Sequence, residues 1–142
     1  MGMRQRSPKW ACCPLGADAP YLQVFRVAGT VALMLEANPA LTPNLVKAIL
    51  QYTAQPLPGA VLLQQGAGML NVDGAVRLAQ ALRTDIATAV EAGTLSAGAN
   101  LLAAGRVLPQ PSSTVNGQTF AWGRIVFVGG RHLVSGDTLF TR

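Results

Sequence analysis

The sequence predicts a mainly helical chain with a small β-hairpin near its C-terminus. Residues 24–37 form a long, almost uncharged apolar stretch. Apolar residues recur with helical spacing in two further stretches, residues 43–54 and 73–92. In "RIVFVGGRHLV", residues with a β preference flank Gly129 and Gly130, a spacing typical of a two-residue hairpin turn.

The first predicted helix, Val24–Ala37, is apolar nearly all round, so we expect it to be buried on most sides. Gly29 inside it costs about 1 kcal/mol relative to alanine and would permit close packing against a neighbour. Asn38 can cap the end of this helix, and Pro39 prevents its continuation.

The second predicted helix starts at a favourable pair of residues. Thr42 is a good N-cap, and Pro43 suits the first helical position. The helix should run to about Ala54 with one apolar face, made of Leu45, Val46, Ile49 and Leu50.

The third predicted helix follows Asp73, which is a good N-cap and whose charge favours the positive end of the helix. A continuous stripe of apolar residues with helical spacing predicts that this helix runs as far as Ala92, with Gly93 as its C-terminal cap. The stripe consists of Ala75, Leu78, Ala79, Leu82, Ile86, Ala89 and Val90.

Three segments are expected along the chain. Residues 1–20 lack periodicity and contain several prolines, and we expect an irregular N-terminal segment that covers residues 1–26. Residues 27–92 hold the predicted helices. Residues 93–142 form an extension with a flexible linker or turn at "QPSSTVNGQ", followed by the hairpin.

Composition limits the class of protein. The 142 residues are enough for one domain, with 50% hydrophobic and only 12% charged residues. The usual charged share is roughly 25%, so either the core is large or apolar surface awaits a partner. The apolar runs fall short of the roughly 20 residues that span a bilayer, so no membrane span is expected.

The net charge of +5 does not indicate a nucleic-acid binder. Four basic residues lie within the first 26, at Arg4, Arg6, Lys9 and Arg26, and the others are scattered singly. No basic run is interleaved with aromatic residues, which make up 6% of the chain, so no nucleic-acid partner is expected.

No catalytic, cofactor-binding or metal-binding residue is predicted. His132, Ser135 and Asp137 have the residue types of a catalytic triad, but all three lie within six residues beside the hairpin turn. A surface histidine is the better interpretation. One histidine and the adjacent Cys12 and Cys13 are too few for a metal site, and no disulfide framework is present. The glycines of "GAGMLNVDG" lack the spacing of a phosphate-binding loop, so no cofactor is expected.

The ordered motifs "VAGTVALMLEANPALTPNLVKAILQYTA" and "GAGMLNVDGAV" resemble the C-terminal part of the subtilisin-like serine protease domain (peptidase S8, the subtilase family). The matching stretches lie within residues 27–82 and are Val27–Leu35, Asn38–Thr42, Val46–Leu50, Thr53–Ala54 and Asn71–Val76. The resemblance implies part of a three-layer α/β fold and peptide-bond hydrolysis by a Ser/His/Asp triad.

The family's nucleophile motif, G-T-S-x-A-x-P, has no counterpart here. Counting back from Gly29, the serine would fall on Tyr21 and the proline on Phe25, within "APYLQVFRVAG". The family's Asp, His and oxyanion Asn motifs would lie further upstream. A phenol has a pKa near 10, and its hydroxyl lies at a different distance from the backbone than a serine hydroxyl does. We therefore expect no hydrolysis by this chain alone.

Two functions follow as expectations. The first is a non-catalytic C-terminal fragment of a subtilisin-like endopeptidase, from a frameshifted, truncated or mis-started gene, with the missing N-terminal half of the protease domain or a second copy as partner. The alternative is an interaction module that docks an apolar helix face on a partner. Because the sheet expected by the helices is missing, we also expect marginal stability. The N-terminus lacks the apolar core of a signal peptide although the family is commonly exported, so the location stays open.

Overall fold

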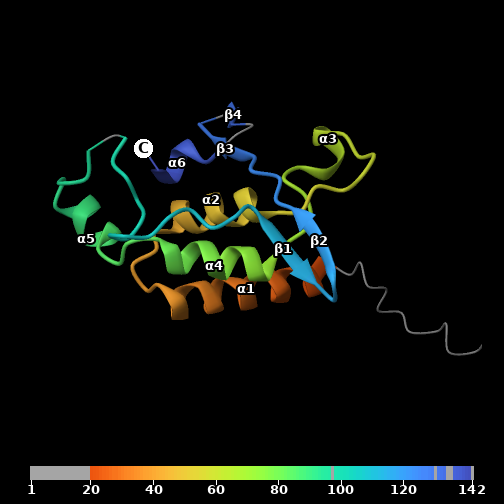
Figure 1. Ribbon diagram of the computed structural model, residues 1–142, viewed down its shortest axis with the longest axis horizontal. Helices are drawn as coiled ribbons and strands as arrows, with labels where there is room; N and C mark the ends of the chain where they lie inside the picture. The colour runs from red at the N-terminus through yellow and green to blue at the C-terminus, as the bar shows by residue number, and fades with distance from the viewer. Residues whose placement is uncertain (1–19, 97, 130, 134–135, 142) are drawn as a thin grey trace, which may run out of the picture.

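The computed structural model describes residues 20–96, 98–129, 131–133 and 136–141 (Figure 1). It confirms the expected fold class, mainly helical with a small antiparallel hairpin near the C-terminus. The elements in chain order are α1 (Pro20–Ala37), α2 (Pro43–Thr53), α3 (Leu62–Gln65), α4 (Val72–Ala81), α5 (Ile86–Glu91), β1 (Ser112–Val115), β2 (Gln118–Ala121), β3 (Val126–Val128), β4 (Arg131–Leu133) and α6 (Thr138–Thr141).

Helix α4 lies at the centre of the molecule, between α1 and α2 (Figure 1). It contacts both of these helices and strand β1, whereas α2 also contacts β3. The hairpin β1–β2 lies at one end of the helical layer and α5 at the other. The C-terminal hairpin and α6 cover the side of α2 that faces away from α4.

Helix α1 starts at Pro20 rather than at Val24, and only one of its sides is buried. Thr30 and Met34 point inward and are almost completely buried. On the opposite side Val24 and Phe25 are 65% and 72% exposed. The expectation that this helix is buried on most sides is therefore wrong. Apolar composition makes burial favourable, but α1 lies at the outside of the layer and α4 covers one side of it.

Asn38, expected to close its own helix, connects two helices instead. Its side-chain amide donates hydrogen bonds to three carbonyl oxygens at the end of α4, those of Ala79, Leu82 and Arg83. Its Oδ1 accepts a bond from the backbone N–H of Ala40, 3.1 Å away. A helix end leaves carbonyl groups without intrahelical partners, and Asn38 binds carbonyls at and just beyond the end of α4.

The predicted start of α2 is confirmed. The Thr42 hydroxyl accepts a hydrogen bond from the backbone N–H of Leu45, and Pro43 occupies the first turn. The helix ends at Thr53, close to the expected Ala54. Such agreement is expected because capping depends on residues only three positions apart.

The N-cap of α4 is Asn71, not Asp73 as expected. Asn71 accepts a hydrogen bond from the N–H of Gly74 through Oδ1 and donates through Nδ2 to the carbonyl of Thr53. Asn71 therefore joins the start of α4 to the end of α2. Asp73 lies in the first turn, where its negative charge still favours the helix.

The helix expected to continue to Ala92 is divided in two. Leu82 adopts an extended conformation and forms a β-bridge with Leu102, while the N–H of Arg83 donates to the carbonyl of Leu101. These bonds with a later segment replace the helical ladder, and α5 begins again at Ile86. Gly93 follows the end of α5 with φ +65°, a backbone conformation that favours glycine.

The predicted hairpin around Gly129 is confirmed as β3–β4, with Phe127 opposite His132. A second hairpin, β1–β2, occupies the region expected to be a linker or turn. Its turn residues Asn116 and Gly117 have φ of +50° and +76°, as a tight Asn-Gly hairpin turn requires.

The core joins the helices to the C-terminal extension. Tyr52 on α2 is fully buried and packs edge-on against two rings from the extension. Its centroid lies 5.9 Å from that of Trp122 and 5.1 Å from that of Phe140. Val126 is fully buried as well. Residues beyond 93 therefore complete the core that the helices begin.

Candidate functional site

Of the three residues that have the types of a catalytic triad, His132, Ser135 and Asp137, the structure describes the side-chain contacts of Asp137 only. Asp137 is held by other side chains, His132 is placed by the backbone pairing of β4, and Ser135 lies outside the described residues. The Asp137 carboxylate accepts a hydrogen bond from the Tyr52 hydroxyl at 2.5 Å and one from Nε of Arg124 at 2.9 Å. Asp137 therefore serves as an anchor between α2 and the C-terminal segment.

The electrostatics of this cluster favour a fixed charge. Burial raises the pKa of Tyr52 well above its ordinary value, and the hydrogen bond to Asp137 raises it further. Burial also acts to raise the pKa of Asp137, but hydrogen bonds from Arg124 and Tyr52 outweigh it and hold that pKa below its usual range. At neutral pH the ionised carboxylate and the neutral phenol stabilise the fold and are poor proton carriers.

A second polar cluster surrounds Ser113, which is 2% exposed. Its hydroxyl donates to Asp73 at 2.7 Å and accepts bonds from Asn71 and from the indole N–H of Trp122. A hydroxyl has one donor and two acceptor positions, so all three are used. The buried serine cannot act as a nucleophile here; it holds β1 and Trp122 against α4.

Arg77 closes this second cluster on its outer side. Its guanidinium binds the carbonyl of Ser112 at 2.9 Å and lies 5.6 Å from the centroid of the Trp122 ring. It also approaches Asp73 at 3.4 Å. The contacts explain why Asp73, although charged, lies beside a buried serine.

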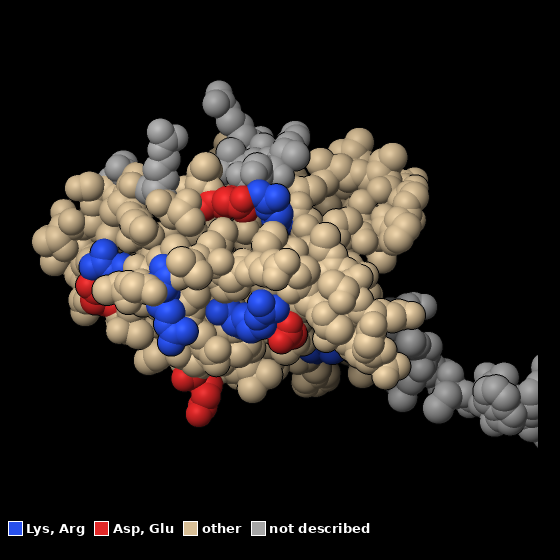
Figure 2. All heavy atoms as spheres, viewed as in Figure 1, with Lys and Arg blue, Asp and Glu red and all other residues tan. Residues whose placement is uncertain are grey.

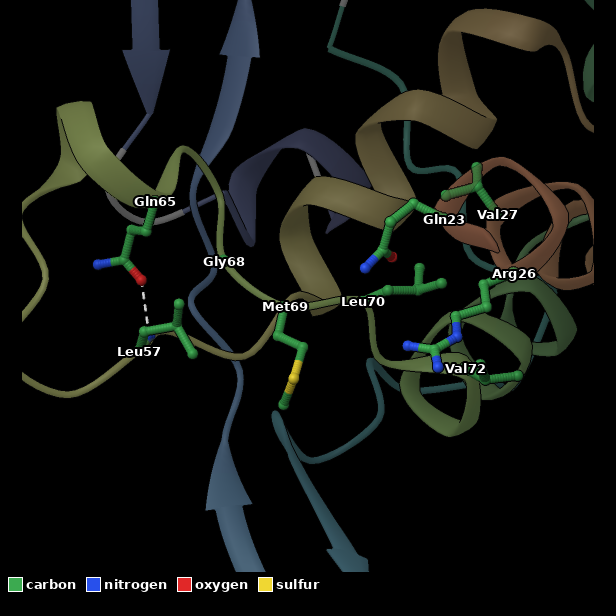
Figure 3. Close-up of a pocket in the computed structure, with 9 residues that line it drawn as sticks. All are labelled: Gln23, Arg26, Val27, Leu57, Gln65, Gly68, Met69, Leu70 and Val72. Carbon is green, nitrogen blue, oxygen red and sulfur yellow. Dashed lines mark hydrogen bonds between the residues drawn. The ribbon is translucent and has the colours of Figure 1, made fainter. Parts of the chain in front are cut away.

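A surface hollow of about 560 Å³ lies where the N-terminal half of α1 meets the segment before α4 (Figure 3). Its walls are mainly apolar, with two amides and one guanidinium among the lining residues. These are Gln23, Arg26, Val27, Leu57, Gln65, Gly68, Met69, Leu70 and Val72. The amide oxygen of Gln65 accepts a 2.6 Å hydrogen bond from the N–H of Leu57. The lining contains no nucleophile or general base, so the hollow has the chemistry of a binding surface.

The described part of the chain contains no group of three or more His, Cys, Asp or Glu residues arranged to hold a metal ion. Cys12 and Cys13 lie outside it. Within the same residues, no helix has both the length and the apolar character needed to cross a bilayer.

Tyr21, on which the sequence resemblance would place the nucleophile, lies in the first turn of α1. Sequence reasoning did not single out Asn71, Ser113 or Trp122, which form the buried cluster. Asn71 had a local signal, because it precedes α4 and an Asn is a strong N-cap. The partners of Ser113 lie about 40 positions away along the chain, so no local signal indicated them.

Comparisons with known proteins give one partial similarity. No family model matches the chain, and no solved structure matches it. A protein from Xanthomonas campestris pv. campestris, described as an extracellular protease, is 50% identical over 54 residues. This match covers 37% of the chain but only 9% of that protein. Part of the chain is therefore similar to a small part of an extracellular protease.

Proposed function

We propose that residues 27–82 derive from the C-terminal part of a subtilisin-like serine endopeptidase domain and that the chain does not hydrolyse peptide bonds itself. The 50% identity over 54 residues to an extracellular protease supports the relationship. The finer assignment rests on the ordered motifs from Val27 to Val76. The local structure is consistent with these motifs, since "ANPALTP" forms the turn from α1 to a capped α2.

The second half of the proposal, that the chain does not hydrolyse peptide bonds, rests on the missing nucleophile. Triad catalysis requires a nucleophile, a base and an orienting carboxylate that converge in space. Tyr21 occupies the serine position, Ser113 is buried with its hydrogen-bonding capacity filled, and Asp137 is bound by Arg124 and Tyr52. Ser113 and Asp137 stabilise structure, and the chain keeps the supporting helices of a protease domain without its chemistry.

The test is an activity assay on the purified full chain. We expect no turnover of a broad set of peptide substrates and no labelling by a fluorophosphonate, which reacts with activated serines. A mock purification from cells that do not express the chain, carried out in parallel, serves as the control for contaminating protease. Turnover that the fluorophosphonate abolishes, and that the purified chain carries in proportion to its amount, would overturn the proposal.

For the segment before Val27, we propose a change of reading frame. The similarity to the family's motifs stops abruptly there, whereas it is dense immediately afterwards. Reading the DNA upstream of the Val27 codon in all frames checks this interpretation. The absence of an encoded G-T-S-x-A-x-P motif would count against it.

A second candidate function is that of an interaction module, and the exposed apolar face of α1 favours it. The discriminating observation is the partner. Co-purification with a separately encoded protease segment favours a split protease domain, whereas a stable assembly of this chain with itself favours the module.

A further inference from the structure

The hollow between the N-terminal half of α1 and the segment before α4 has apolar walls that are open to solvent (Figure 3). Val27, Leu57, Met69 and Val72 line it, and each is between 40% and 52% exposed. Exposed apolar side chains that lie together mark a binding surface more often than singly exposed ones do. The volume of about 560 Å³ falls within the roughly 300–1,000 Å³ of typical ligand sites. The hollow is therefore large enough for a ligand with an apolar group.

The charge of the hollow comes from Arg26, the one charged residue among the described residues that line it. Gln23, Arg26 and Val27 have helical spacing and share one side of α1. Figure 3 shows the side chains of Gln23 and Arg26 extending from α1 toward the segment that holds Leu70. Within the described residues, the guanidinium has no hydrogen bond or ion pair. Charge complementarity therefore indicates a ligand with a carboxylate, which a guanidinium can bind through two parallel hydrogen bonds.

The main chain at Leu70 offers a further hydrogen-bonding edge beside the hollow. Met69 exchanges two main-chain hydrogen bonds of 2.8 Å with Gln55, one in each direction. In an extended chain, successive residues present their N–H and C=O groups to opposite edges, so those of Leu70 point away from Gln55. Neither group of Leu70 has a hydrogen-bond partner among the described residues. An extended peptide can pair with such an edge.

We propose that this hollow binds the C-terminal end of an extended peptide whose last residue is apolar. The free carboxylate binds Arg26, the last side chain packs against Val27, Met69 and Val72, and the peptide main chain pairs with Leu70. A peptide fits better than a fatty acid, because the N–H and C=O groups of Leu70 require a partner that both donates and accepts hydrogen bonds.

The proposal goes beyond the protease relationship and uses only the walls, charge and main chain of this hollow. Binding and hydrolysis are therefore tested separately, with mass spectrometry of the peptide after incubation. A peptide that binds and stays intact supports both proposals, whereas cleavage of a bound peptide overturns only the absence of hydrolysis.

The first experiment measures fluorescence anisotropy of labelled hexapeptides with the purified full chain. The peptides end in Leu, Val, Phe or Met after randomised positions, and each set is prepared with a free carboxylate and as the C-terminal amide. We expect at least one free-carboxylate set to bind, and its amide to bind about tenfold more weakly because it loses the charge-assisted bond. Absence of binding by every set would overturn the proposal. Decanoate that binds more tightly than every set would overturn the choice of a peptide.

The second experiment tests the contact with Arg26. Arg26→Gln should lower the affinity for the free carboxylate about tenfold and leave the affinity for the amide unchanged, because only the carboxylate uses the charge. A merely structural role would weaken both peptides equally. Met69→Glu, which adds a negative charge to the wall, should likewise weaken the free carboxylate more than the amide.

Arg106→Gln is the matched control, because Arg106 is exposed and does not line this hollow. This variant should keep the tenfold preference for the free carboxylate. Circular dichroism verifies that all three variants are folded. An Arg26→Gln chain that retains the full preference would overturn the proposal.

Discussion

At the scale of single residues, three buried or half-buried polar side chains connect elements that are distant in the sequence. Asn38 joins the ends of α1 and α4, Asn71 joins α2 and α4, and Asp137 joins α2 and the C-terminal segment. Each makes several hydrogen bonds, as burial of polar groups requires. Asn38, Asn71 and Asp137 therefore stabilise the tertiary arrangement and not only their own turns.

The Tyr52–Asp137 pair predicts a pH-dependent stability. The folded-state pKa of Tyr52 is raised, so its share of the stability is complete below the ordinary tyrosine pKa of about 10 and is lost as the pH rises above that value. The folded-state pKa of Asp137 is lowered, so its share is present above about pH 4 and is lost as the pH falls below it. The free energy of unfolding should therefore have a plateau between these limits.

Tyr52→Phe tests this assignment by urea denaturation at several pH values. We expect the variant to be less stable by about 1.5–3 kcal/mol at neutral pH, because it loses a hydrogen bond to a charged group. The variant should also lose less stability above pH 10 than the wild type does. Its decline at acid pH should remain, since Arg124 still binds Asp137. An unchanged alkaline decline would show that Tyr52 is not the group responsible.

At the scale of elements, the sequence predicted the ends of helices well where the signal was local. Thr42 and Pro43 begin α2 as expected, and Gly93 follows α5. The division between α4 and α5 could not be predicted, because its cause is pairing of Leu82 with Leu102. The exposure of one side of α1 was likewise not predictable, since the apolar pattern of a helix does not say how many neighbours cover it.

Two helical glycines predict opposite effects of the same substitution. Gly29→Ala should stabilise α1 by up to about 1 kcal/mol, because alanine is the better helix former and the added methyl group meets open space. Gly74→Ala should destabilise the chain by about 1–3 kcal/mol. There the new Cβ would lie 2.9 Å from the Trp122 ring and 2.5 Å from the Asn71 amide.

Thermal and urea denaturation of both variants in dilute solution measures the two changes in stability. Each variant is compared with the other, since both add one methyl group to a helical glycine. Equal effects at the two positions would contradict the packing of Trp122 against Gly74.

At the scale of the whole molecule, residues 27–92 and the C-terminal extension contribute to one core. Trp122, Val126 and Phe140 come from the extension and are almost completely buried. Main-chain hydrogen bonds add to this link, for example from the N–H of Gly123 to the carbonyl of Ala54 and from that of Leu101 to the carbonyl of Phe140. The role of residues 93–142 is thus at least structural.

Deletion of residues 94–142 should abolish the cooperative fold. The shortened chain would expose Tyr52 and the apolar side of α2, and the marginal stability expected from the missing sheet leaves little reserve. Near-ultraviolet circular dichroism and amide hydrogen exchange measure the loss. The full chain is the control, and a shortened chain with native-like protection in α2 and α4 would contradict the prediction.

The distribution of charge at this scale is mixed. The face in Figure 2 shows basic and acidic side chains interspersed, and three described arginines form ion pairs with nearby aspartates. The absence of a nucleic-acid partner stays a prediction, which this arrangement supports because no large basic patch covers that face.

By itself the sequence determined the helical class, the capped start of α2, the hairpin at Gly129, and the partial similarity to a protease. These features depend on residues a few positions apart or on the order of residues, so they can be read locally. Only the tertiary structure decided that α1 leaves one side exposed, that the helix after Asn71 divides at Leu82, and that Trp122 and Phe140 complete the core. Each of these depends on which distant segments lie beside one another, because burial belongs to pairs of surfaces and not to single stretches of chain.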